Sequence, residues 1–549
     1  MAKRFPRIAV KVNCMEQRED TPMRVLRTYK YEGPLPLGSV LANNCGAAGL
    51  FVAPKGMGVE PADVLLKAIE KDGRYHLEVF LGQDLFLETE GPISPEGRKT
   101  IGKEVLYALR TAQGIATYGV WGSLVGVRPT KLYARAFDEI FLDKLLDLKE
   151  PASLEQGTEF YNTIHKAVEK RFKNRHNVAP SIIKNLREIF DFQRPYLEKA
   201  VANDRCISLY SGIPFCQSHC IYCSFPYGLV QEYAELDRFV ETYGRDIDNI
   251  GEILERYNLK LESLYMGGGT PTSLNNADFD FIVSKLGNLL HKYGQTSAST
   301  NSFTRTRASE FTVEAGRPDS VTPEKIQSMY AAGVNRISIN PQSMQDHILQ
   351  RIGRAHTAEA VKELYEYVRK HTSFDINMDF IAGLPEQTFK DMEVNMDFVC
   401  RTLPENVTIH TLALKRGSPL YEQKGSVTLP TLSEVEEMVH YSRQRLLEAG
   451  YKPYYLYRQQ YMTGQFENIG YTLPDKECVY NIQMMEERQT VLSVGPGSSS
   501  KWIRIKGQGP EFDMVKQHMP KNVDTYIETF DNLMNKRNML SKKFWESEG

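Results

Sequence analysis

The chain has 549 residues, of which 41% are hydrophobic and 25% charged, a composition typical of a soluble globular protein with two or three domains. Its formal net charge of −2 gives no electrostatic reason to expect binding to nucleic acid or to an anionic membrane surface. No stretch approaches the roughly 20 apolar residues of a membrane-spanning helix, and the N-terminus lacks the apolar core of a signal peptide. We therefore expect a cytoplasmic protein.

Residues 1–205 are predicted to form an N-terminal α+β domain. The spacing of apolar residues indicates strands at 7–12 and 76–81, and helices at 61–71, 95–111 and 181–200. Glycine, proline and one tryptophan make segment 118–131 typical of a packed, irregular turn. An alternative interpretation is that Arg128 and Lys131 in this segment contact substrate carboxylates. No pattern in this domain marks catalysis, so its role stays open.

The sequence ISLYSGIPFCQSHCIYCSFPYG, residues 207–228, carries the clearest chemical signal. Cys216, Cys220 and Cys223 have C-x3-C-x2-C spacing, whereas the other five cysteines stand singly, which favours reduced thiols over a disulfide framework. An iron–sulfur cube and a structural zinc site both take four ligands, so three close cysteines predict a cluster with one open iron. A disulfide knot or three separate buried thiols are the alternatives. The strand-like run before the loop and the helical pattern after it favour the cluster, because (β/α) barrels keep their chemistry at the carboxyl ends of strands.

From residue 206 onward, strand-like and helical segments alternate, which is typical of parallel β/α units. A helix is predicted with Thr322 as N-cap and Gly333 just past its end, and another with Ser433 and Glu436 as a capping box, closed by Gly450. Six strands are predicted, at 207–210, 261–266, 311–313, 335–340, 374–381 and 407–414. The fold prediction is therefore α/β, with a partial (β/α)6 TIM-like barrel at residues 206–450.

Residues with chemical potential stand at the ends of these predicted strands. Three glycines, residues 267–269, follow the second strand directly, so a ligand can approach the backbone there. Glu314, Gln342 and Asp379 lie at or near the ends of later strands, and Arg354 follows. Each of them alone has an ordinary structural explanation, such as a capped turn or a surface ion pair. Together they are what a site at the mouth of a barrel requires.

Residues 451–549 are predicted to be a C-terminal extension that packs on the barrel. Segment 451–461 is rich in tyrosine and strand-like. Its rings are expected either to pack against the open edge of the barrel or to line a pocket for a flat macrocycle. The polar end of the chain, residues 542–549, is expected to be frayed.

Together these motifs resemble the signature of the radical S-adenosylmethionine (SAM) superfamily. Within it the chain is similar to the oxygen-independent coproporphyrinogen III dehydrogenase-like proteins (HemN/HemZ-type), in the longer HemZ-type branch. The resemblance rests on the cysteine motif, on the GGGTP turn, on the twelve-residue spacing from Gln342 to Arg354, and on NMDFIAGLP around Asp379. It implies that the three cysteines bind a [4Fe–4S] cluster whose open iron binds SAM. It also implies cofactor contacts by Tyr210, Tyr222, Gly268, Gly269, Thr270, Glu314, Gln342, Arg354 and Asp379.

The resemblance further implies a reaction. A coproporphyrinogen dehydrogenase is an oxidoreductase of porphyrin and haem biosynthesis that removes a β-hydrogen and carbon dioxide from propionates, giving protoporphyrinogen IX. The implied partners are a small-molecule substrate, porphyrinogen or haem, and an electron donor such as flavodoxin or ferredoxin. Propionates need basic partners, for which Arg128 and Arg458 are candidates.

Two departures from the family's pattern leave the function open. Phe225 stands where the dehydrogenases have a further cysteine, and the family's haem chaperones have phenylalanine at that position. The chaperones' H-N-x-x-Y-W motif reads ENIGYT here, with Glu467 in place of histidine and Thr472 in place of tryptophan. A haem-binding chaperone is therefore one alternative, and a radical SAM enzyme with another substrate, such as a methyltransferase, is the other.

Overall fold

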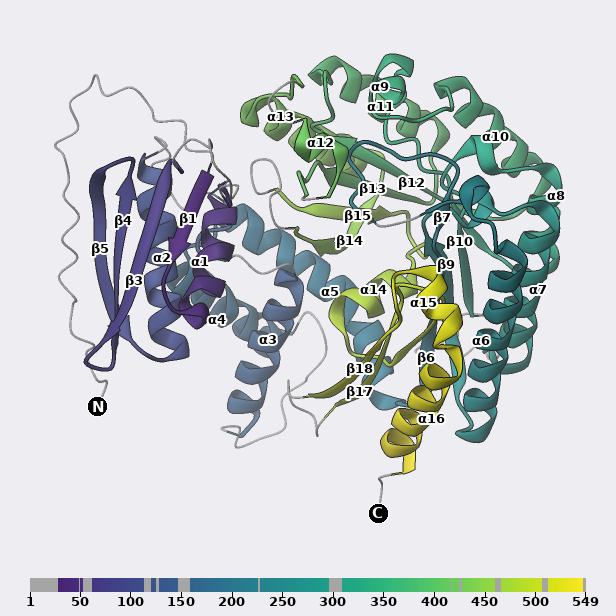
Figure 1. Cartoon of the computed structure of the whole chain (residues 1–549), viewed down its shortest axis with the longest axis horizontal. Helices are drawn as coiled ribbons and strands as arrows, with labels where there is room; N and C mark the ends of the chain where they lie inside the picture. The colour runs from purple at the N-terminus through teal and green to yellow at the C-terminus, as the bar shows by residue number, and fades with distance from the viewer. Residues whose placement is uncertain are drawn as a thin grey trace. The chain divides into compact units, whose positions relative to one another are not determined.

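The computed structural model describes residues 28–48, 50–52, 62–112, 120–124, 128–146, 158–225, 228–295, 309–415, 417–423, 427–459, 466–505 and 512–546 (Figure 1). The chain forms two compact units. Unit 1 comprises residues 1–127, 165–185 and 458–466, and unit 2 comprises residues 128–164, 186–457 and 467–549. The predicted domain boundaries after residues 205 and 450 stay predictions. The strand predicted at 7–12 lies outside the described residues.

Unit 1 is built on a five-stranded sheet with the strand order β2-β1-β3-β4-β5. Two helices pack their apolar faces on this sheet and share its core. The elements are β1 (Thr28–Glu32), α1 (Leu35–Ala47), β2 (Phe51–Val52), β3 (Val64–Lys71), β4 (Arg74–Leu81), β5 (Asp84–Pro92) and α2 (Pro95–Ala112). The predicted strand at 76–81 and helix at 95–111 are confirmed as β4 and α2.

The helix predicted at 61–71 is wrong, because this segment is strand β3. Its apolar residues fit a helical as well as an alternating pattern, and in the structure Val64, Leu66 and Ala68 alternate with more exposed neighbours. The following pair decides between the two patterns. Asp72 and Gly73 adopt φ angles of 51° and 72°, and β3 pairs antiparallel with β4 on either side of them. Such a two-residue turn matches the twist of a hairpin and fixes its register.

Three helices precede the first barrel strand: α3 (Pro129–Leu146), α4 (Glu159–His176) and α5 (Pro180–Ala202). The helix predicted at 181–200 is confirmed as α5. No helix in the described part of the chain is both long and apolar enough to span a bilayer.

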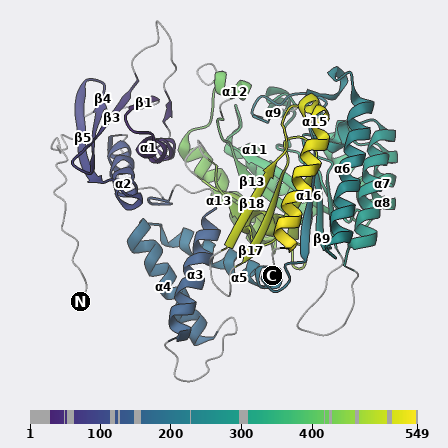
Figure 2. The same ribbon diagram turned by 60° about the horizontal axis from the view of Figure 1, so that its bottom comes forward.

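Unit 2 is built around an 11-stranded sheet with the order β14-β15-β13-β12-β11-β10-β9-β6-β16-β17-β18. Its six central strands, from β6 to β13, are all parallel, and helices cover the outer face of the curved sheet (Figures 1 and 2). The strands are β6 (Cys206–Ile213), β9 (Lys260–Gly268), β10 (Glu310–Glu314), β11 (Arg336–Ser338), β12 (Asp375–Ala382) and β13 (Asn406–Thr411). The helices that follow them are α6 (Leu236–Arg256), α7 (Asn276–Tyr293), α8 (Pro323–Ala331), α9 (Asp346–Arg351), α10 (Ala358–His371), α11 (Phe389–Thr402) and α13 (Leu432–Glu448). The predicted partial (β/α)6 barrel is thereby confirmed.

The N-caps of two barrel helices test the predictions made from local sequence patterns. Thr322 accepts a hydrogen bond from the backbone of Lys325, so the predicted cap of α8 is confirmed. The capping box of α13 is present, but it is formed by Thr431 and Glu434 rather than by Ser433 and Glu436. The helix begins two residues earlier than predicted. Thr431 also fits the capping-box pattern and is the N-cap residue.

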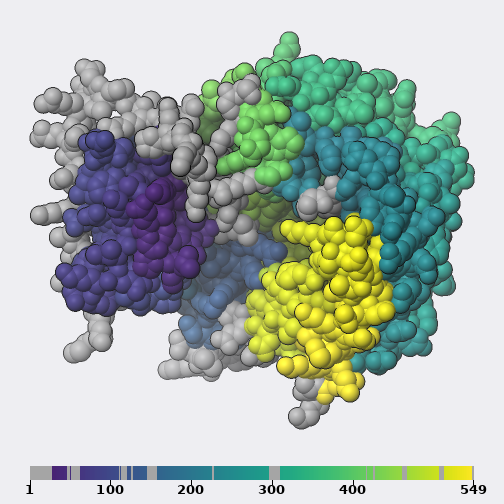
Figure 3. Space-filling view, in the orientation of Figure 1, coloured from purple at the N-terminus to yellow at the C-terminus, as the bar shows by residue number. Residues whose placement is uncertain are grey.

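C-terminal residues complete the sheet at both of its edges. Strands β14 (Lys452–Tyr457) and β15 (Asn468–Thr472) are antiparallel additions beside β13, whereas β16 (Val491–Val494) pairs parallel with β6. The other elements are α14 (Val479–Glu486), β17 (Ser499–Ile505), β18 (Phe512–His518), α15 (Val523–Glu528) and α16 (Phe530–Glu546). Helices α15 and α16 pack on α6. In the space-filling view the yellow C-terminal residues lie directly against the teal residues of the barrel (Figure 3). Because Phe544 and Trp545 are buried in α16, the prediction of a frayed end is wrong as far as residue 546.

Candidate functional site

The three predicted cluster ligands lie in one loop directly after β6. Cys216 belongs to the short strand β7 (Phe215–Cys216), and the backbone N–H of Cys223 donates to the carbonyl of Cys220 at 3.1 Å, which closes a turn. All three thiols are partly exposed, whereas Cys206 and Cys478 are buried. The fold thus presents three accessible thiols at the carboxyl end of a barrel strand.

The glycine turn after β9 lets this loop approach closely. Gly268 has a φ of 115°, in the region that favours glycine. The N–H of Thr270 donates to the carbonyl of Phe215 at 2.7 Å, and its hydroxyl lies 3.6 Å from the Cys216 sulfur. A Cβ on Gly269 would lie 2.3 Å from the Phe215 oxygen and 3.0 Å from that sulfur. Only glycine therefore fits between the turn and the cysteine loop.

The donor set suits a cluster with an open iron. Burial raises the pKa of the Cys216 thiol to about 11 and also raises the pKa of the Cys223 thiol, and iron removes such protons because it binds thiolates. Among the described residues, no group of three or more His, Cys, Asp or Glu side chains is arranged to hold one metal ion. The thiolates of a cube bind three different irons, so they need not converge on one point.

Arg354 connects the cysteine loop to two neighbouring strand ends. Its Nη2 donates to the Tyr222 hydroxyl at 3.1 Å, and its Nη1 donates to the carbonyls of Gly316 and Asn340, each at 3.1 Å. The preceding residue, Gly353, has a φ of 79°. The Nε of Arg354 is buried without a hydrogen-bond partner, so this fixed guanidinium has a donor left for an anionic ligand.

Glu314, the last residue of β10, faces a wall of tyrosines. The Tyr265 hydroxyl donates to Glu314 Oε1 at 2.6 Å. Burial raises the pKa of Glu314 to about 7, although the hydrogen bond from Tyr265 acts in the opposite direction. The Tyr265 ring stacks on Tyr480, with 4.6 Å between centroids, and lies 6.4 Å from the ring of Tyr210. The hydroxyl of Tyr480 is buried without a hydrogen-bond partner.

Gln342 and Asp379 meet through their backbones beside this wall. The N–H of Gln342 donates to the carbonyl of Asp379 at 2.9 Å, and Gln342 has a φ of 67°, which is uncommon outside glycine. The Asp379 carboxylate lies 3.6 Å from His410 Nε2, and His410 Nδ1 lies 3.2 Å from the Tyr457 hydroxyl. Burial would raise the pKa of Asp379, but His410 and the hydrogen bonds from Asn377 and Thr408 together outweigh it, and the pKa is lowered. Asp379 therefore stays an ionised acceptor.

The two arginines predicted as substrate contacts have partners within the fold. Arg128 pairs with Glu487 at 2.5 Å, and Lys131 and Lys501 pair with the same carboxylate. In unit 1, the guanidinium of Arg458 lies 4.6 Å from the centre of the Trp121 ring and donates to the carbonyl of Leu124 at 2.7 Å. Trp121 is 1% exposed, so the packed turn predicted around it is confirmed for residues 120–124. These contacts give the two arginines structural roles and do not support their predicted role at a substrate.

Sequence reasoning missed Tyr265, Tyr480 and His410. His410 is a titratable residue near the end of a predicted strand, the same signal that selected Asp379. Tyr265 stands two residues before Gly267 in β9, so its side chain points to the same face of the strand as Gly267. Tyr480 gave no local signal, because only the tertiary fold brings α14 to the barrel.

Comparison with known proteins decides the family. Residues 210–399 match the model of the Radical SAM superfamily. Over 507 residues the chain is 32% identical to the oxygen-independent coproporphyrinogen-III oxidase-like protein HemZ of Bacillus subtilis, covering 89% of this chain and 92% of that protein. The chain belongs to this family of radical SAM proteins. The family's cofactors are a [4Fe–4S] cluster and SAM, and these are the cofactors of this protein.

Two further similarities concern parts of this radical SAM chain. It is 30% identical to the heme chaperone HemW of Bacillus subtilis, over 42% of this chain and 57% of that protein. Its structure is similar to that of coproporphyrinogen III oxidase (HemN) from Escherichia coli, with a TM-score of 0.44 and 21% identity, covering 62% of this chain and 73% of that one.

Proposed function

We propose that the protein oxidatively decarboxylates the propionates of coproporphyrinogen III and gives protoporphyrinogen IX. The observation that carries the proposal is the 32% identity to a coproporphyrinogen-III oxidase-like protein across 89% of the chain, flanks included. A protein named anaerobic coproporphyrinogen III oxidase, from Cereibacter sphaeroides, is also 26% identical over 57% of the chain.

In this proposal the residues at the barrel mouth divide the work. Cys216, Cys220 and Cys223 hold the cluster and leave one iron open for SAM. The free donor of Arg354 binds the carboxylate of SAM, and the turn at 268–270 receives its amino group. Glu314, Gln342 and Asp379 bind ribose and amino groups, with the rings of Tyr210 and Tyr222 enclosing the site. When bound, these cofactors supply a 5′-deoxyadenosyl radical that can remove a hydrogen atom from an unactivated carbon.

The reaction at each propionate balances as a two-electron oxidation. One hydrogen atom leaves the β-carbon, the bond to the carboxyl carbon breaks, and carbon dioxide departs. One electron passes to an acceptor, and a vinyl group remains. The reducing partner in this proposal is an electron donor such as flavodoxin or ferredoxin, and the three cysteines would hold the cluster that receives its electron. The chain's part is to orient the propionate and to exclude water.

Lys415 is proposed as the cation that receives a substrate carboxylate. It follows β13, and its ammonium lies 5.7 Å from the centre of the Phe225 ring in the cysteine loop. No carboxylate among the described residues lies within ion-pair distance of it, and burial lowers the pKa of its ammonium. The charged group that acts on Lys415 is the Cys223 thiol of the cysteine loop, so the ammonium stands beside the proposed cluster. A partly buried cation without a carboxylate partner gains from a propionate, and the tyrosine wall offers a flat surface for a macrocycle.

A haem chaperone is the second candidate, favoured by Phe225 and by the similarity to HemW. The segment that corresponds to the chaperones' haem motif contributes to the sheet here. Glu467 is 6% exposed, and β15 lies between β13 and β14. Asn468 Oδ1 accepts from the N–H of Thr411 at 2.9 Å. These contacts support a structural role for the segment and favour the enzyme.

Anaerobic turnover tests the proposal. Cluster-reconstituted protein is incubated with coproporphyrinogen III, SAM, a low-potential reductant and an electron acceptor, and the products are analysed by mass spectrometry. We expect a porphyrinogen that has lost one or two carboxyl groups, together with 5′-deoxyadenosine. Cys216→Ala is the inactive control, and Lys415→Met is expected to raise KM more than it lowers kcat. Stoichiometric haem with a ligand-specific absorption band, and no release of carbon dioxide, would support the chaperone instead.

A further inference from the structure

Arg317 places a buried positive charge against the cysteine loop. It follows β10 by three residues and is 3% exposed. Its Nη1 donates to the Ser218 hydroxyl at 2.7 Å and to the Ser218 carbonyl at 3.3 Å. Ser218 is the middle residue between Cys216 and Cys220. The backbone that spaces two proposed cluster ligands is therefore fastened to a guanidinium.

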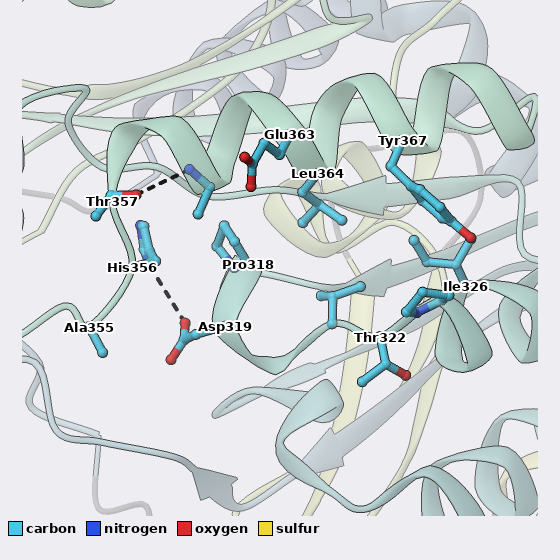
Figure 4. A pocket seen from close by; sticks show the side chains of 13 residues that line it. Pro318, Asp319, Thr322, Ile326, Ala355, His356, Thr357, Glu363, Leu364 and Tyr367 are labelled. Carbon is cyan, nitrogen blue, oxygen red and sulfur yellow. Dashed lines mark hydrogen bonds and ion pairs between the residues drawn. The ribbon is translucent and has the colours of Figure 1, made fainter.

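Asp319 and His356 hold this guanidinium from the other side. Arg317 Nε and Nη2 donate to the two oxygens of Asp319 at 3.2 and 3.0 Å, a planar fork that fixes the orientation of the side chain. His356 Nδ1 lies 3.7 Å from Asp319 Oδ1 (Figure 4). The His356 side chain is fully buried, so it confines the Asp319 carboxylate.

The arrangement reaches from the cysteine loop to the outer layer of the barrel. Asp319 and His356 line a cavity of about 480 Å³ between the segment after β10 and helices α8 and α10, together with Thr322, Thr357 and Glu363 (Figure 4). The Arg317 guanidinium donates hydrogen bonds to Ser218 and Asp319, whereas Arg354 contacts Tyr222 and strand ends. Arg317 therefore acts on the cluster loop rather than on the proposed SAM contacts.

We propose that Arg317 is a positioning residue that holds the Cys216–Cys220 segment and raises the reduction potential of the bound cluster, with Asp319 and His356 as its support. The inference rests on the proposed ligation by the three cysteines. A reduced cluster carries one more negative charge, so a nearby cation with hydrogen bonds to the ligand loop stabilises it. The carboxylate of Asp319 offsets part of that charge.

Redox titration of the cluster, followed by electron paramagnetic resonance without substrate, tests the inference. Arg317→Gln is expected to make reduction at least tenfold less favourable, which is a shift of about 59 mV or more to negative potential. Arg317→Lys keeps the charge and should recover part of the shift. Asp319→Asn removes the opposing charge and should shift the potential in the positive direction. Arg351→Gln is the matched control, because Arg351 on α9 pairs with the half-exposed Glu386, and it should leave the potential unchanged.

The results separate this inference from the assignments beneath it. An unchanged potential in Arg317→Gln, with full iron content, would overturn the inference. If Arg317→Gln loses the cluster, the reduction potentials of Arg317→Lys and Asp319→Asn are compared instead. Equal potentials in those two variants would overturn the inference. Iron retained in Cys216→Ala would show instead that the ligand assignment is wrong. Turnover of coproporphyrinogen is not used, so failure of the proposed reaction does not affect the result.

Discussion

Glu314 occupies an unfavourable place for a carboxylate. It ends a barrel strand, is confined by tyrosine rings and accepts hydrogen bonds from the Tyr265 hydroxyl and from the backbone of Gly268. Burial raises its pKa to about 7, so a large fraction is protonated at neutral pH in the absence of ligand. A ligand with hydroxyl groups and a positive charge would restore the ionised form. The residue is thus tuned for binding at the expense of stability.

Glu314→Gln should stabilise the ligand-free protein in a pH-dependent way. The pKa is about 7 in the folded protein and 4.5 in the reference state, so ionisation disfavours the folded state increasingly from pH 4.5 to about pH 7. Glutamine keeps an acceptor for Tyr265 and removes this penalty. We expect a gain of up to about 3 kcal/mol at pH 8 and almost none below about pH 4, measured by denaturant unfolding. Glu324→Gln, at the exposed start of α8, is the control and should give no gain. A gain that is the same at both pH values would contradict the explanation.

At the scale of helices and strands, the sequence predicts the elements that depend on local patterns and misses those that depend on long-range contacts. Patterns that depend on neighbours in sequence were readable: the strand before the cysteines, the cap at Thr322, and the parallel alternation. Segment 61–71 was misread because a short apolar run fits both periods, and the adjacent Asp72–Gly73 turn decides between them. The cysteine motif and the strand-end acids were found, because barrel chemistry gathers at strand ends. Tyr480, which comes from α14, was not, because its contact with Tyr265 is long-range.

Gly269→Ala should displace the cysteine loop without unfolding the barrel. Its Cβ would lie 2.3 Å from the carbonyl oxygen of Phe215, so β7 must move. We expect loss of most of the bound iron with an unchanged circular dichroism spectrum. Gly333→Ala is the matched control: its φ of 81° strains a side chain, but a Cβ there meets nothing within 4 Å. That variant should lose about 1 kcal/mol of stability and keep its iron. Full iron content in Gly269→Ala would refute the close approach.

The corrected capping box of α13 makes a direct comparison possible. Thr431→Ala removes the acceptor for the Glu434 N–H and should cost about 1 kcal/mol of unfolding free energy. Ser433→Ala, at the position that the sequence favoured, should change stability little. Urea unfolding of the two variants distinguishes the two starts of the helix. A larger loss in Ser433→Ala would show that the helix begins two residues later, with Ser433 as its cap.

At the scale of the whole molecule, the C-terminal residues are part of the barrel unit. Strand β16 pairs with β6, the strand that leads into the cysteine loop, so residues almost 300 positions apart in sequence share one ladder, with Val491 opposite Ser208. A buried ion pair fastens this region. Asp246 of α6 and Arg537 of α16 are each 0% exposed and meet at 2.6 Å. Asp246 also accepts from Tyr526 and from the N–H of Gly495, and Arg537 donates to the carbonyl of Ser493 in β16. The predicted extension is therefore continuous with the fold that carries the site.

Breaking this pair should destabilise unit 2 far more than breaking a surface pair between the same helices. Arg537→Met leaves the Asp246 carboxylate buried without its cation, and Asp246→Asn leaves the guanidinium without its anion, so each should cost about 3–5 kcal/mol. The double variant Asp246→Asn/Arg537→Met should lose clearly less than the sum, because neither residue then leaves an unpaired buried charge. Arg245→Met removes the exposed Arg245–Asp531 pair, which also joins α6 to α16, and should have little effect. Urea unfolding of the four variants measures the coupling. Strict additivity of the two buried substitutions would show that Asp246 and Arg537 do not act as a pair.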